Sequence, residues 1–136
     1  MAVFALTSCF VSINSVDMSQ YVAGVEVSIE SNELDTTDFA SSGWKEVIGG
    51  LKSGNVMVKF NQDFASTTVD DRLFALFGTV TAFLVRPTSA SVGATNPNYT
   101  FSALIDNYTP LAGSVGDLAT MDLTWPISGA VTRATS

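Results

Sequence analysis

Residues 96–136 read NPNYTFSALIDNYTPLAGSVGDLATMDLTWPISGAVTRATS, and this stretch says most about the fold. Two strand-like runs stand in it, over residues 99–106 and 119–125, and the loop between them ends in Gly116 and Asp117. In each run apolar residues alternate with polar ones, which is the period of a strand with one buried face. Pro126 is expected to end the second run, because proline cannot donate to a β-ladder. Two such runs joined by turn residues indicate a β-meander or two packed sheets.

Shorter strand patterns precede this stretch. The alternation is strict over residues 25–30, where Val25, Val27 and Ile29 are expected on the buried face, and it returns over residues 55–61; residues 79–86 are also strand-like. The dipeptides Gly49-Gly50 and Ser53-Gly54 predict turns or a bulge before the second run.

The start of the chain has a hairpin pattern. Residues 4–13 are mostly apolar and β-branched or aromatic, and Asn14 with Ser15 offers a tight turn, so we expect a hairpin preceded by a short free arm. In total the chain predicts seven or eight short strands and one helix. The fold class is therefore mainly β, with two packed sheets in a sandwich or barrel-like arrangement and one short α-helix.

One helix is predicted just after residue 68. Thr67 or Thr68 can cap it, Asp70 and Asp71 lie in the first turn where the helix dipole favours negative charge, and Gly78 stops it. First-turn acids of this kind are ordinary dipole partners, so they do not indicate a catalytic pair. The apolar stripe expected to pack on a sheet consists of Val69, Leu73, Leu76 and Phe77.

Composition predicts a single domain over residues 1–136 with little charge. Only 14% of the residues are charged, against about 25% in typical soluble domains, and 31 of the 136 residues are Ser or Thr. Such a surface fits a protein packed against copies of itself, and also an ordinary soluble β domain. The net charge is −7 and six acids precede the first basic residue, Lys45, so this half cannot neutralise phosphates. Cys9 stands alone, which favours an intracellular folding compartment, and no run reaches the roughly 20 apolar residues of a membrane span, so no membrane partner is expected.

Residues 31–44 read SNELDTTDFASSGW and predict a long loop, which in a compact domain is either disordered or functional. Its candidate contact residues are Asp35, Asp38, Phe39 and Trp44. Two large aromatic side chains in so polar a segment need a surface to cover. That surface is the core in a monomer, or a neighbouring subunit in an assembly, and the sequence leaves both open.

Enzymatic chemistry is not indicated. Histidine, the usual general base and the commonest metal ligand, is absent from the sequence. Glycine-rich phosphate loops, nucleophile elbows and zinc clusters are absent too, and the acids near residue 35 lack the ligand pattern of an EF-hand. We therefore expect no catalytic residue, no metal and no cofactor.

Three segments carry a resemblance. They are residues 35–51 (DTTDFASSGWKEVIGGL), residues 95–99 (TNPNY), and GSVGD at 113–117 with the closing GAVT at 129–132. In this order they resemble the major tail tube proteins of long-tailed, siphovirus-type bacteriophages. The pattern is similar in tube subunits of phage-like bacteriocins and of gene transfer agents.

The resemblance implies a domain that assembles into rings, usually of six subunits, which stack into a hollow tube. Inner strands of neighbouring subunits join into a barrel around a lumen, which a tape measure protein fills before DNA passes through without specific binding. It implies an inter-ring role for residues 31–44 and contact arms over residues 1–8 and 127–136. Further partners are tail terminator and tip proteins, and the location is the virion tail, after synthesis in the host cytoplasm.

One expectation combines the resemblance with charge. An acidic lumen would repel phosphates and let DNA slide, so the candidates for the lumen are Glu26, Ser28 and Glu30. The same polar face also fits one that simply meets solvent outside.

The alternative function is a β-sandwich that binds a ligand, such as a carbohydrate, through exposed aromatic residues. Tyr99, Tyr108 and Trp44 are the candidates for such a site. A binding module of this kind would recognise its ligand without forming tubes.

Overall fold

The computed structural model describes residues 3–136 and is mainly β, as the sequence predicts. Within these residues, seven strands form one antiparallel sheet in the order β2-β1-β5-β6-β7-β4-β3. The strands are β1 (Phe10–Ile13), β2 (Val16–Asp17), β3 (Val22–Asp35), β4 (Val47–Asn61), β5 (Val80–Arg86), β6 (Asn98–Leu104) and β7 (Thr120–Ala134). One α-helix, α1 (Val69–Leu76), and two short 3-10 turns, Ser19–Tyr21 and Phe39–Ser41, complete the fold.

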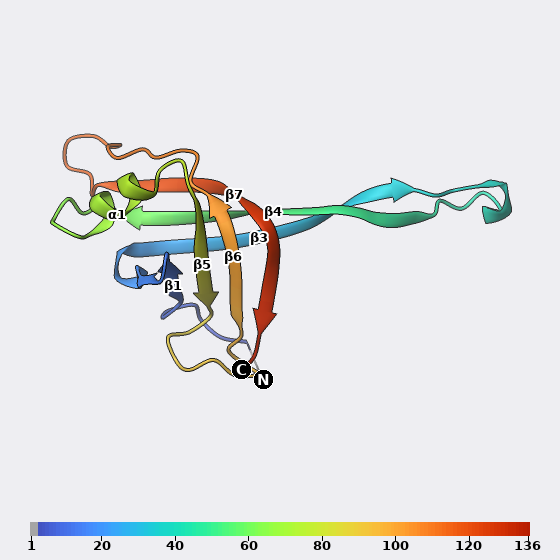
Figure 1. Ribbon diagram of the computed structural model, residues 1–136, viewed down its shortest axis with the longest axis horizontal. Helices are drawn as coiled ribbons and strands as arrows, with labels where there is room; N and C mark the ends of the chain where they lie inside the picture. Colours follow the sequence, from blue (N-terminus) through green and yellow to red (C-terminus); the bar gives the residue numbers. More distant parts are fainter. Residues whose placement is uncertain (1–2) are drawn as a thin grey trace.

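The sheet folds over on itself at β7. Residues 120–126 of this strand pair with β4, and residues 127–134 pair with β6. The first half of β7 therefore runs with β3 and β4, whereas the second half turns and runs with β5 and β6 (Figure 1). The two packed sheets predicted from the sequence are thus the two halves of one continuous sheet, and β7 is the strand that joins them.

Pro126 does not end β7, so this prediction is wrong. It lies opposite Asn55, in the last pair that β7 forms with β4 before it turns toward β6. A missing N–H group costs little at the point where a strand changes partner. The C-terminal arm predicted over residues 127–136 is consequently corrected, because residues 127–134 are strand and only the last two residues follow it.

The core lies between the two halves of the sheet. Its largest side chain, Trp125, is 0% exposed, and its ring centroid lies 6.2 Å from that of Phe60 and 5.7 Å from that of Phe83. The indole Nε1 donates a hydrogen bond of 3.0 Å to the carbonyl oxygen of Asn107. The alternation predicted over residues 55–61 and 119–125 is confirmed, since the inward positions are buried: Val56, Val58, Phe60, Met121, Leu123 and Trp125.

The N-terminal hairpin is confirmed at its turn. Asn14 and Ser15 both have positive φ angles, 53° and 66°, as a tight two-residue hairpin turn requires. The first strand begins at Phe10 rather than near residue 4, because Phe10 pairs with Arg86, where β5 ends. Residues 3–9 contain no strand. Residues 3–8 of the predicted N-terminal arm lie in this segment, and residues 1 and 2 of it fall outside the described chain.

Helix α1 follows the predicted apolar stripe except at its end, and Thr68 is its N-cap by position, although the Thr68 side chain makes no capping hydrogen bond. Val69 and Leu73 are buried, and Leu76 packs against the core. Phe77 was expected in the same stripe but is 52% exposed, because the helix ends at Leu76 and the Phe77 backbone is extended (φ −57°, ψ 129°). Gly78 follows with φ 85°, consistent with the predicted stop. Within residues 3–136, no helix is long and apolar enough to span a bilayer.

Candidate assembly surfaces

A two-stranded arm projects from the body of the molecule (Figure 1). β4 pairs with β7 only from Asn55 onward, so residues 47–54 of β4 pair with β3 alone. Eight strand residues beyond the body correspond to about 26 Å. The loop predicted over residues 31–44 is therefore too long and misplaced, because β3 extends to Asp35 and β4 begins at Val47. Within the described residues, neither face of the arm is covered by another layer, so its sequence needs no apolar alternation.

Glycines shape this arm but do not break it. The turns predicted near Gly49, Gly50 and Gly54 are wrong, since β4 runs through all three. The predicted bulge is confirmed, because the register with β3 shifts between the pairs Ser31–Lys52 and Glu33–Gly49. A Cβ atom on Gly54 would lie 2.6 Å from the carbonyl oxygen of Ser28, so only glycine fits where the two strands approach closely.

The tip of the arm, from Asp35 at the end of β3 to Glu46, is ordered by its own hydrogen bonds. The backbone N–H of Thr37 donates to Asp35 Oδ1 (2.8 Å), and that of Ala40 donates to Asp38 Oδ1 (3.0 Å). Across the turn, the N–H of Thr36 donates to the carbonyl oxygen of Glu46 (2.9 Å). The hydrogen bonds from Thr37 also hold the pKa of Asp35 below its usual value, which keeps this carboxylate ionised.

The two aromatic residues of the tip are uncovered. Phe39 is 108% exposed and Trp44 is 78% exposed, so neither packs back onto the core. The sequence left open whether these rings cover the core or a neighbouring subunit, and in the single chain they do not cover the core. Lys45 and Glu33 form an ion pair of 2.7 Å beside them.

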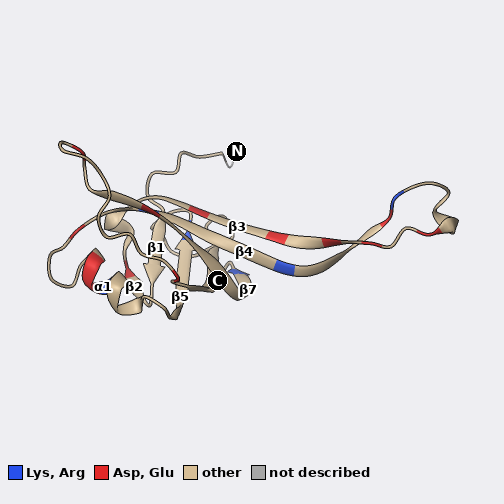
Figure 2. Cartoon of the chain, turned by 90° about the horizontal axis from the view of Figure 1, so that it is seen from above, with Lys and Arg blue, Asp and Glu red and all other residues tan. Residues whose placement is uncertain are grey.

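The candidate lumen residues lie on the open face of the sheet. Glu26, Ser28 and Glu30 are all exposed, opposite the partly buried Val25 and Val27. Figure 2 shows acidic positions along β3 and basic ones on β4. The register extends this face across three strands, because directly paired residues point the same way. Its further members, which sequence reasoning missed, are Ser53, Asn55, Met57 and Lys59 of β4 with Asp122 and Thr124 of β7.

Ile29 does not share the burial of Val25 and Val27. Its side chain is 64% exposed, although the alternation predicted it on the buried face. The reason is its position opposite Gly54, where the sheet passes from the body into the arm and the covering layer ends. β3 is also the last strand of the sheet, so within residues 3–136 its outer edge has no partner strand.

The aromatic residues of the alternative binding site do not come together. Trp44 is at the tip of the arm, whereas Tyr99 lies in β6 of the body. Tyr108 is engaged internally, since its hydroxyl donates to Asp70 Oδ1 (2.6 Å) and accepts from Gln62 Nε2 (3.2 Å). Burial and the Asp70 carboxylate raise the pKa of Tyr108 to about 12. In the described part of the chain, no three His, Cys, Asp or Glu residues are grouped to hold a metal ion.

Comparison with known proteins identifies relatives by structure only. No protein-family model matches the sequence, and no curated protein does. A chain in the virion of a native gene transfer agent particle superposes with a TM-score of 0.73 and 19% identity, covering 93% of this chain and 95% of that one. A chain in the tail of an empty gene transfer agent particle, refined with C6 symmetry, gives 0.60 and 21%, covering 82% and 81%.

A third match comes from an extracellular contractile injection system. It is a chain of the PVC sheath/tube terminator in the extended state, with a TM-score of 0.72, 14% identity and 96% of both chains covered. At such identities the likeness concerns the fold. The chain therefore has the fold of these tail and injection-system subunits, which confirms the phage tail fold that the resemblance implied.

Proposed function

We propose that this protein is the structural subunit of a phage-type tail tube, which polymerises as stacked rings. The observation that carries the proposal is the arm, because its tip is internally ordered and yet leaves two aromatic side chains, Phe39 and Trp44, uncovered. A monomeric module gains nothing from an extended arm that holds its aromatic residues away from the core. A subunit that binds the next copy with this tip does.

Ring closure uses the edges of the sheet. Among residues 3–136 the outer edge of β3 is unpaired, and joining such edges between neighbouring subunits satisfies the exposed backbone groups. The C6 symmetry of the tail to which one structural neighbour belongs supports rings of six. In such a ring, sheets joined side by side form a continuous barrel around a lumen.

The lumen is lined by the open face of the sheet. In this arrangement Glu26, Ser28 and Glu30 face the channel, beside the polar residues that β4 and β7 add to the same face. Acids repel phosphate groups, whereas a lysine-rich or arginine-rich lining would hold DNA electrostatically. DNA therefore passes through the tube without specific binding, after a tape measure protein has left it.

The remaining contacts follow from the same role. Asp35, Asp38, Phe39 and Trp44 of the tip contact the adjacent ring, and terminator and tip proteins close the two ends of the tube. The protein is made in the host cytoplasm and resides in the virion tail. This role needs no cofactor, metal or membrane partner.

Electron microscopy of the purified protein, concentrated stepwise and combined with light scattering, tests the proposal. We expect rings or hollow tubes of uniform diameter. The double variant Phe39→Ala/Trp44→Ala should stay folded and fail to polymerise, whereas the control Trp44→Phe, which keeps an aromatic ring, should still form tubes. A wild-type chain that stays monomeric at every concentration, also beside preformed tail tip complexes, contradicts the proposal.

A further inference from the structure

A cleft of about 480 Å³ lies in the fork where the arm leaves the body. Its floor is apolar, and the lining residues include Ile29, Gly54, Ile127, Gly129, Ala130 and Val131. A Cβ atom on Gly54 would lie 3.0 Å from Ile29 Cγ2 and 3.1 Å from Ile127 Cδ1. The missing side chain thus lets the two isoleucines approach each other, and the floor they form stays exposed to solvent at Ile29.

We propose that this cleft, called the fork cleft below, receives the arm tip of a second copy of the chain. The inference rests on the proposed tube function and names the surface that the tip binds. Phe39 and Trp44 are the two aromatic residues of the tip. Both rings are exposed, so they need an apolar partner surface in order to leave water. The floor formed by Ile29 and Ile127 is such a surface.

Charge complementarity supports this choice of partner. Over residues 33–46 the arm carries four acids and one base, and that base, Lys45, is paired with Glu33. The fork cleft has Lys52 on its wall, and Arg133 follows Val131 by two strand residues, about 7 Å along β7. The one acid lining the cleft is Glu30. The charged side chains of the lining balance, and Arg133 beside the lining adds one positive charge, so the negative tip meets a surface with two bases and one acid.

The acids of the tip are prepared for a second partner. Asp35, Asp38 and Glu46 each accept hydrogen bonds within the tip through one carboxylate oxygen: Oδ1, Oδ1 and Oε1. Among the described residues their other oxygens accept none. These oxygens are free for Lys52 and Arg133 of the next copy, and the carboxylates are already held in place, which lowers the entropic cost of the contact.

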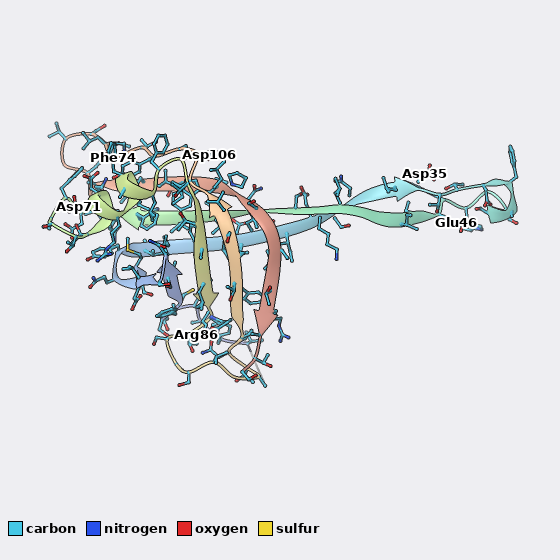
Figure 3. The ribbon with its side chains drawn as sticks, in the orientation of Figure 1. Asp35, Glu46, Asp71, Phe74, Arg86 and Asp106 are labelled. Atoms are coloured by element: carbon cyan, nitrogen blue, oxygen red, sulfur yellow. The ribbon has the colours of Figure 1, made fainter. Side chains whose placement is uncertain are left out.

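A second exposed apolar region of the body is a worse partner. Around α1, Phe74 and Phe77 are exposed, but the helix carries two acids, Asp70 and Asp71, against one base, Arg72. Figure 3 places Asp71 and Asp106 in the same end of the body as Phe74, with Asp35 and Glu46 at the far end of the arm. Like charges repel when they are brought together, so the acidic tip is directed away from α1 and toward the fork cleft.

The shape of the molecule fits head-to-tail docking. A tip that binds the base of another arm makes a heterologous contact, because the two surfaces are different parts of the chain. Copies displaced along the arm repeat this contact without closing it, which gives an open linear assembly. Stacked rings need an axial contact of this kind.

Disulfide cross-linking tests the docking directly. In a Cys9→Ser background, Phe39→Cys/Ala130→Cys should give a ladder of covalent multimers after mild oxidation of assembled tubes, because both positions are exposed and would adjoin across the contact. The matched control Phe39→Cys/Phe74→Cys should give at least about 10-fold less. Tubes that cross-link only through position 74, or through neither position, overturn the docking and leave the tube function standing. A chain that forms no tubes overturns both.

Charge exchange provides a second, independent test. Lys52→Glu/Arg133→Glu should abolish tubes without unfolding the subunit, since both residues are exposed. Adding Asp38→Lys and Glu46→Lys should restore them by reversing both sides of the contact. Normal assembly of the first variant counts against the fork cleft as the docking surface, whereas tubes restored in the second set support it.

Discussion

Strands β3 and β4 run through both the body and the arm, yet the tryptophan beside β4 in the body is buried and the one at the tip of the arm is exposed. Along residues 55–61, β4 is covered by the other half of the sheet, and Trp125 of its neighbour β7 is 0% exposed. Along residues 47–54, β4 has only β3 beside it, and Trp44 at the tip is 78% exposed. The buried contacts that stabilise the fold are therefore concentrated in the body, whereas the arm carries uncovered aromatic surface.

The difference begins at one place in the chain. β7 leaves β4 after Pro126, and from that point the arm has a single ladder and no covering layer. A two-stranded hairpin is marginally stable by itself in water. The arm is therefore held by its continuity with β3 and β4 of the body, and the proposed contact with a second copy would cover it.

Two tryptophan substitutions test this comparison with the largest expected effect. Trp125→Ala removes a fully buried ring and its hydrogen bond to Asn107, so we expect the free energy of unfolding to fall by about 3–5 kcal/mol. Trp44→Ala removes a ring that contacts little in the subunit, and the expected change is within about 0.5 kcal/mol. Urea unfolding followed by circular dichroism measures both. Equal losses for the two variants would show that the arm shares the core of the body.

A tyrosine at the edge of the body tests how firmly its loops are attached. Tyr108→Phe removes the hydrogen bond to the Asp70 carboxylate, which connects the segment after β6 to α1, and should cost about 1–2 kcal/mol. The pKa of Tyr108 is raised to about 12 in the fold, above its ordinary value of 10.0. The protonated hydroxyl therefore stabilises the fold below pH 10, and this contribution is lost as the pH rises toward 12.

Unfolding measured between pH 8 and pH 11.5 follows this linkage. The difference in stability between wild type and Tyr108→Phe should shrink over the upper part of this range. A difference that stays constant with pH would mean that the hydroxyl makes no contribution tied to its ionisation. Asp70→Asn is the matched control, since it keeps an acceptor but removes the negative charge.

The strands that could be predicted from the sequence are those that the core covers. Over residues 55–61 and 119–125 one face is buried, and burial is what imposes the alternation of apolar and polar residues. The arm strands have no buried face, so their sequence carries no period and predicts a loop. β7 beyond Pro126 was missed for a related reason, because only tertiary pairing with β6 decides that the strand continues.

The candidate surfaces could be predicted from the sequence only where they lie within one strand or one loop. The exposure of Glu26, Ser28 and Glu30 followed from their alternation with valines, whereas their neighbours on β4 and β7 depend on strand register. The sequence singles out Phe39 and Trp44 as candidate contact residues. It does not show whether they pack on the core, because that depends on the direction in which the arm projects. The fork cleft combines β3, β4 and β7, which are far apart in the sequence, and no local pattern signals it.

The prediction with the smallest effect on stability concerns the proposed lumen. Glu26→Lys/Glu30→Lys alters two exposed side chains on the open face, so unfolding should change by less than about 0.5 kcal/mol and tubes should still form. Positive charges there would bind phosphates as DNA passes, and delivery of DNA by tail-bearing particles should slow. Added salt should relieve the delay, because it screens this attraction. The variant Glu26→Gln/Glu30→Gln, which removes charge without reversing it, should delay DNA less. Normal delivery of DNA by particles with lysine at both positions would place this face outside the channel.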